Sequence, residues 1–144
     1  MKKAIVLMMA AVLLVGVMSY SFVADAWDAT PAPMDNNPND YLCGSVYVSL
    51  DLASAQSSVV HESRNTYSLY VSLAGWVNHS FAFSDSASTN SSDSIQVDCN
   101  YTNVQNIGTQ LLSEHSVFFN NTQVASGSIL VTKNGDGPWI QSNW

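Results

Sequence analysis

Basic side chains are the scarcest chemical group in this sequence, whose 144 residues include 4 Lys and Arg against 11 Asp and Glu. Lys2 and Lys3 stand before a long apolar run, which leaves only Arg64 and Lys133 in the rest of the chain. Proteins that bind nucleic acids gain most of their affinity by neutralising phosphates with such side chains. We therefore expect no nucleic-acid partner, and an anionic membrane surface would repel the acidic chain as well.

Catalytic signatures are missing too. The sequence contains neither a G-x-S-x-G nor an S-x-x-K motif, and nothing marks any two of its carboxylates as a glycosidase pair. His61-Glu62 and Glu114-His115 could supply metal ligands if their strands were neighbours. Adjacent residues of a strand point to opposite faces, however, so we expect exposed polar residues at strand ends. The chain is not predicted to be an enzyme, and His61 and His115 are only weak metal candidates.

A defined calcium loop is also absent. The stretches 35–40 and 134–137 are rich in Asn, Asp and Gly. Their oxygen atoms suit calcium, with Asp35, Asp40 and Asp136 as candidate ligands. The same residue types are the ordinary chemistry of turns. We therefore expect no cofactor, and calcium is the alternative.

Cysteine occurs only twice, at Cys43 and Cys99. Two lone cysteines lack the spacing of a zinc site. In an exported protein they can oxidise, and Cys99 lies at an inward position of a strand pattern. We predict a Cys43–Cys99 disulfide, and closing a loop of that length contributes about 4 kcal/mol in the chain-entropy model.

The N-terminus carries the clearest positive signal. Lys2 and Lys3 precede an apolar run over 5–17, and Ala24-Asp25-Ala26 is a small-x-small cleavage pattern. This predicts a signal peptide over 1–26, cut before Trp27, and places the protein outside the cell or on its surface. If the segment stays uncleaved, residues 5–23 are just long enough to span a bilayer, which is the only membrane contact we expect.

A third interpretation of the N-terminus comes from its layout. A basic start, an apolar helix and a Ser/Thr-rich β domain together resemble archaeal pilins. The resemblance covers about 25 residues. It implies processing after Ala4 and an assembly helix over 5–27.

Residues 27–40 hold Pro31, Pro33 and Pro38 and show no apolar periodicity. Prolines exclude a helix or a central strand here, so we predict a linker or an extended arm. An arm with Trp27 at its tip either docks on a neighbouring copy or is a disordered spacer.

From Tyr41 onward apolar residues alternate with polar ones, which is typical of strands that are buried on one face. About seven such strands predict an antiparallel β-sandwich over 41–144. We place Asn120-Asn121 and Asn134-Gly135 in turns, 84–94 in a solvated loop and at most one helical turn over 53–56. The predicted strands are 46–52, 67–73, 81–83, 95–101 and 127–131, with weaker ones at 58–62 and 110–119.

Four N-x-S/T sequons offer candidate glycosylation sites, close to the number that the composition gives by chance. Their asparagines are Asn78, Asn90, Asn100 and Asn120.

Tyr47 and Tyr70 fall on the outward faces of their predicted strands, where aromatic rings stack on sugars or meet other proteins. The sequence favours a secreted or cell-surface, non-enzymatic structural or adhesive domain. It would be a subunit of a filament or surface layer that contacts itself or other surface proteins. The alternatives are a carbohydrate-binding module that uses Tyr47, Tyr70 and Trp76, and the pilin-like subunit.

Overall fold

The structure, a computed structural model, describes residues 25–102, 104, 108–135 and 139–143. The apolar run of the predicted signal peptide therefore lies outside the described residues, as does Asp136. Within those ranges every regular element is a strand, and no helix there could cross a membrane. The strands are β1 (Asp25–Asp28), β2 (Ala32–Met34), β3 (Asn37–Val48), β4 (Leu52–Val60), β5 (Ser68–Val77), β6 (Ser80–Thr89), β7 (Ser94–Asn100), β8 (Thr109–Phe119), β9 (Thr122–Lys133) and β10 (Ile140–Asn143).

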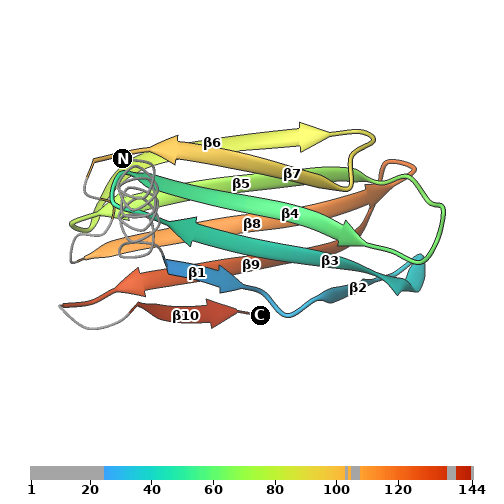
Figure 1. The fold of residues 1–144 in the computed structure, drawn as a ribbon, viewed down its shortest axis with the longest axis horizontal. Helices are drawn as coiled ribbons and strands as arrows, with labels where there is room; N and C mark the ends of the chain where they lie inside the picture. Colours follow the sequence, from blue (N-terminus) through green and yellow to red (C-terminus); the bar gives the residue numbers. More distant parts are fainter. Residues whose placement is uncertain (1–24, 103, 105–107, 136–138, 144) are drawn as a thin grey trace, which may run out of the picture.

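These strands form two antiparallel sheets that pack face to face (Figure 1). Sheet A has the order β1-β3-β4-β7, with β2 also paired to β3. Sheet B has the order β10-β9-β8-β5-β6. The all-β fold with two antiparallel sheets agrees with the prediction, although the strands are more numerous than expected.

The core lies between the sheets because the apolar side chains of each strand point toward the opposite sheet. Strand β5 shows this plainly, since Leu69, Val71 and Leu73 are buried and the residues between them are partly exposed. The main cluster combines both sheets and contains Val46, Val48, Ala53, Ala55, Val71, Leu73, Val97, Cys99, Val104, Leu111, Ile129 and Val131.

The proline-rich segment 27–40 is part of the domain rather than a linker. Strands β1 and β2 both pair with β3 of the same chain, at the edge of sheet A. An edge strand tolerates Pro33 because its outer N–H groups need no partner. Trp27 turns into the core and packs on Trp139 beside β10, with the ring centroids 5.4 Å apart.

Strand β1 also bears on two of the three interpretations of the N-terminus. It begins at Asp25, so it spans the predicted cleavage site between Ala26 and Trp27. The last three residues of the assembly helix in the pilin-like interpretation are in β1 as well.

The predicted strand 46–52 is in fact a hairpin. Strand β3 ends at Val48, and the amide of Ser49 donates to the carbonyl of Leu52, where β4 begins. Leu50 sits in the turn with 52% of its surface exposed. Because Leu50 is apolar, the alternating sequence pattern runs on through the turn. The pattern therefore did not indicate that one strand ends at Val48 and the next begins at Leu52. Residues 53–56, for which at most one helical turn was expected, belong to β4.

The polar run that we predicted as a loop over 84–94 is largely strand. Ser84 to Thr89 complete β6, and β7 already begins at Ser94. Strand β6 is the edge of sheet B and is exposed over much of its length, so hydrogen bonds to β5 can hold it without an apolar phase. An alternating sequence pattern indicates a strand only where one face is buried. Little of β6 is buried, so the pattern is absent there.

Two hairpin turns use consecutive residues with positive φ. Asn120 and Asn121 have φ of 50° and 64°, which confirms the predicted turn between β8 and β9. Asn78 and His79, at 51° and 62°, form the same kind of turn between β5 and β6. Asparagine is among the residues that tolerate this backbone.

The predicted disulfide is wrong, because Cys43 and Cys99 are both free thiols. They flank β4 on opposite sides, with Cys43 opposite Ser58 and Cys99 opposite Ala53. Five residues of strand and two strand spacings separate their Cα atoms by roughly 19 Å, whereas a disulfide needs less than about 7 Å. Cys99 points inward as predicted, but Cys43 is on the outer face of the same sheet.

Candidate functional site

The predicted metal candidates do not converge. Among the described residues no group of three or more His, Cys, Asp and Glu side chains could hold a metal ion. His61 is a surface residue whose Nε2 lies 3.3 Å from a carboxylate oxygen of Asp93. Asp35 is exposed, and Asp136 lies outside the described residues.

Asp40 is buried, and both of its carboxylate oxygens already accept hydrogen bonds. One accepts from the backbone amides of Glu62 and Ser63 at 3.1 and 3.2 Å, the other from the hydroxyls of Ser63 and Tyr67, each at 2.5 Å. Burial alone would raise the pKa of Asp40, but these hydrogen bonds outweigh it and lower the pKa to about 2. Asp40 therefore anchors the loop between β4 and β5.

His115 is not an exposed strand-end residue, as we expected, but a core residue with 1% of its surface exposed. Its Nδ1 lies 2.8 Å from the Ser57 hydroxyl of sheet A, and its Nε2 lies 2.8 Å from the Ser113 hydroxyl of its own strand. The Ser57 hydroxyl also donates to the Tyr70 carbonyl. Its oxygen is then free to accept from Nδ1–H, and Nε2 accepts from Ser113.

This network bridges the two sheets with a neutral imidazole. Burial lowers the pKa of His115 to about 4, because the charged ring would lose its hydration. Glu114, the next residue, is exposed on the opposite face, as strand alternation requires. His115 is therefore a buried residue whose hydrogen bonds join the two sheets.

The three aromatic candidates lie on two different surfaces. Tyr47 is on the outer face of sheet A, with 39% of its surface exposed. Tyr70 and Trp76 are partly exposed on β5, on the outer face of sheet B. The structure therefore does not bring Tyr47 together with the other two.

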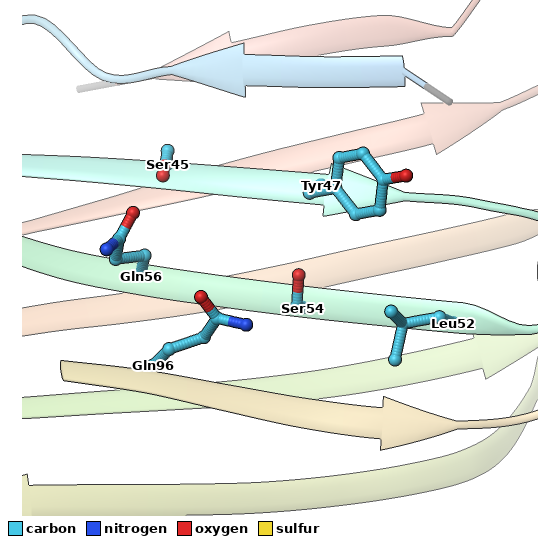
Figure 2. Close-up of a pocket in the computed structure, with 6 residues that line it drawn as sticks. All are labelled: Ser45, Tyr47, Leu52, Ser54, Gln56 and Gln96. Carbon is cyan, nitrogen blue, oxygen red and sulfur yellow. The ribbon is translucent and has the colours of Figure 1, made fainter. Parts of the chain in front are cut away.

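A hollow surrounds Tyr47 on the outer face of sheet A (Figure 2). It has a volume of about 220 Å³, and a second hollow of about 410 Å³ adjoins it through Ser45 and Gln56. We call the two together the sheet A groove. Its first part is lined by Ser45, Tyr47, Leu52, Ser54, Gln56 and Gln96, and its second part adds Asp28, Ala29, Pro31, Cys43, Gly44 and Ser58.

The groove exists because the sequence puts small side chains at outward positions of the two middle strands. The short side chains of Ser45 and Ser54 cover little of the backbone of β3 and β4, so the surface is low there. The longer side chains of Tyr47, Gln56 and Gln96 project around this low area. The amide nitrogen of Gln96 donates to a carboxylate oxygen of Asp98 at 2.7 Å. This bond fixes the Gln96 amide and leaves its oxygen available as an acceptor.

The outer face of sheet B carries a cluster of apolar side chains in two neighbouring rows, which also contain Gln110 and Thr132. Trp76 faces Phe81 across β5 and β6, Ala74 faces Leu112, and Leu112 faces Leu130. Phe81 and Ile140 are the most exposed, at 63% and 57%. We call this set the sheet B patch: Ala74, Trp76, Phe81, Leu112, Leu130 and Ile140.

Sequence reasoning found Trp76 in this patch but missed the leucines. Leu111-Leu112 and Ile129-Leu130 are adjacent apolar pairs within strands. In a strand one member of each pair must face outward, so such pairs predict apolar surface on the second face. That signal was present and could have been used.

The four sequon asparagines are all exposed. Asn78 and Asn120 lie in hairpin turns, Asn90 in the loop between β6 and β7, and Asn100 at the end of β7. Each is sterically open to modification.

No family model matches this chain, and neither the curated proteins nor the solved structures include one with significant similarity to it.

Proposed function

We propose that this protein is a secreted or cell-surface, non-enzymatic structural domain that associates with further copies of itself through the sheet B patch. The observation that carries the proposal is the patch itself. It gathers six apolar side chains in two neighbouring rows across all five strands of sheet B, with Gln110 and Thr132 between Trp76 and Ile140. A cluster of exposed apolar side chains with polar residues among them is typical of protein–protein interfaces.

A second copy is the occupant that the charge distribution favours. The chain has a formal charge of −7, so two copies repel each other over most of their surfaces. None of the six patch residues is charged. Burying this face against its counterpart removes apolar surface from water without placing carboxylates opposite each other.

The rest of the outer face of sheet B is more polar than the sheet B patch. Ser72 donates to the carboxylate of Glu114, and Ser116 and Ser126 lie beyond them. The apolar side chains are therefore concentrated at one end of the sheet, and Tyr70 is an outward aromatic residue nearer the other end. A defined end-patch fits repeated contacts between subunits in a filament or surface layer.

Sedimentation velocity at micromolar concentration, with negative-stain microscopy of the same samples, tests the proposal. The variant Phe81→Ser/Ile140→Ser removes the two most exposed patch residues and should weaken self-association at least tenfold. The matched control is Leu50→Ser/Val60→Ser, which removes two equally exposed apolar residues outside the patch. A wild-type protein that stays monomeric at about 100 µM, or a control that dissociates as much as the patch variant, would contradict the proposal.

A further inference from the structure

We propose that the sheet A groove binds a neutral saccharide, with one pyranose ring stacked on Tyr47. The inference goes beyond the proposed function, because it concerns the opposite sheet and requires no contact between copies. It rests on the shape of the groove, on the orientation of one aromatic ring and on the polar groups around it.

Tyr47 supplies the stacking surface. It is 39% exposed, and Figure 2 shows its ring nearly face-on in the view onto the outer face of sheet A. A pyranose has an apolar face of C–H groups, which packs on an aromatic face that lies open to solvent. Leu52 borders the same hollow and extends its apolar floor.

Amides and hydroxyls meet the polar edge of the ligand. A sugar presents adjacent hydroxyls that both donate and accept, and the side-chain amides of Gln56 and Gln96 can do the same. The Gln96 amide is held in place by Asp98, so it loses little conformational freedom on binding. Ser45 and Ser54 keep the floor low enough for a ring to enter.

Charge selects a neutral ligand. None of the six residues that line the hollow at Tyr47 is charged. The chain as a whole is acidic, Asp28 lines the second hollow, and Asp98 is hydrogen-bonded to Gln96. Uronic and sialic acids would be repelled, whereas hexoses would not. The second hollow, which shares Ser45 and Gln56 with the first, has room for the next unit of a chain.

Binding is tested with the full domain by NMR titration against cellohexaose and maltohexaose, with polygalacturonate as the anionic comparison. We expect saturable shifts at amides of β3, β4 and β7 with at least one neutral hexasaccharide, and none with polygalacturonate. Tyr47→Ala should weaken that binding at least tenfold, and Tyr47→Phe, which keeps the ring, should retain it.

Tyr70→Ala is the matched control, because Tyr70 is an outward tyrosine of the other sheet. Loss of binding in Tyr70→Ala but not in Tyr47→Ala would overturn the inference, as would the absence of shifts with both neutral sugars at millimolar concentration. Each variant is also examined by sedimentation velocity. A failure of sugar binding is thereby distinguished from a failure of self-association, which belongs to the sheet B patch.

Discussion

At the scale of single residues, the imidazole of His115 has the most restricted position in the core. Hydroxyls hold both ring nitrogens, and the backbone of Gly44 lies against its flat side. A methyl group built on Gly44 would stand 2.8 Å from Cδ2 of His115. The glycine is therefore needed for close approach of the two sheets.

Replacing Gly44 by Ala should destabilise the fold by roughly 1–3 kcal/mol, because the ring can move aside only by giving up its hydrogen bonds. Gly127→Ala is the matched control. Gly127 is opposite His115 on β9, yet an added methyl there has nothing within 4 Å. Urea denaturation of both variants should show a lower midpoint for Gly44→Ala alone. Equal losses in the two would show that the backbone, not the imidazole contact, sets the cost.

The buried histidine also predicts a pH dependence. In the unfolded chain His115 takes up a proton near pH 6.5, whereas in the folded chain its pKa is about 4. The folded state therefore binds fewer protons between these values. Its full stability is present above pH 6.5 and falls by about 1.4 kcal/mol per pH unit as the pH drops toward 4.

Urea unfolding at pH 7, 6 and 5 measures this slope, and His115→Asn should remove it. His61 acts in the opposite direction. Its pKa is raised by its hydrogen bond to the carbonyl of Ser63 and by Asp93, so its contribution is present at low pH and is lost as the pH rises. His61→Asn should therefore steepen the slope. Asp40 adds no slope in this range, because its stabilisation is fully present above pH 3.8 and is lost only as the pH falls toward 2.

At the scale of elements, the two edge strands β1 and β10 close one side of the molecule. Trp27 and Trp139 meet between them, and the amide of Gln141 donates to the carbonyl of Asp28 at 3.0 Å. Lys133 lies 5.8 Å from the centre of the Trp139 ring. Each of the two short strands pairs with its neighbour over only four residues, and the aromatic contact links the two strands across the sheets.

Trp27→Ala should cost about 3 kcal/mol of stability, and Trp139→Ala a comparable amount. A double-mutant cycle should give a coupling energy of about 1 kcal/mol, since the rings pack on each other. Thermal unfolding of the four proteins supplies the numbers. Additive losses would mean that each ring packs on the core independently and that the two edges are not linked.

The sequence correctly predicted the strands in which buried apolar residues alternate with exposed ones. The alternation around Leu69, Val71 and Leu73 placed β5 correctly, and Asn120-Asn121 marked the hairpin between β8 and β9. Strand β6 was predicted only over 81–83, and its polar second half was missed because an edge strand needs only backbone pairing. The segment 27–40 was missed because proline marks an edge as readily as a linker. The local sequence shows the periodicity of a strand, but it does not show which other strand pairs with it.

The candidate sites divide in the same way. Tyr47 was found because its outward position follows from strand alternation. Gln56 and Gln96 were not, because only the pairing of β4 with β7 places them opposite each other. The disulfide failed for the same reason, since only the strand order shows that β3 and β7 share one sheet with β4 between them and that the two cysteines are on opposite faces of it.

At the scale of the whole molecule, an acidic surface opposes the association that the sheet B patch favours. With a formal charge of −7, neighbouring copies repel over a distance that salt shortens. Raising NaCl from about 20 to about 500 mM should therefore strengthen self-association, as measured by sedimentation velocity. The patch variant Phe81→Ser/Ile140→Ser should gain little from added salt. Weaker association at high salt would point to contacts between opposite charges instead.

The position of β1 has a consequence for the order of events if the chain is cleaved at the predicted site. A protease that cuts between Ala26 and Trp27 needs that backbone extended and unoccupied, but in the finished fold Ala26 and Trp27 are paired with Tyr47 and Val46. Folding and processing therefore compete for the same four residues. A chain that folds first shields its own scissile bond, so any maturation at this site must finish while β3 is still unpaired along that edge.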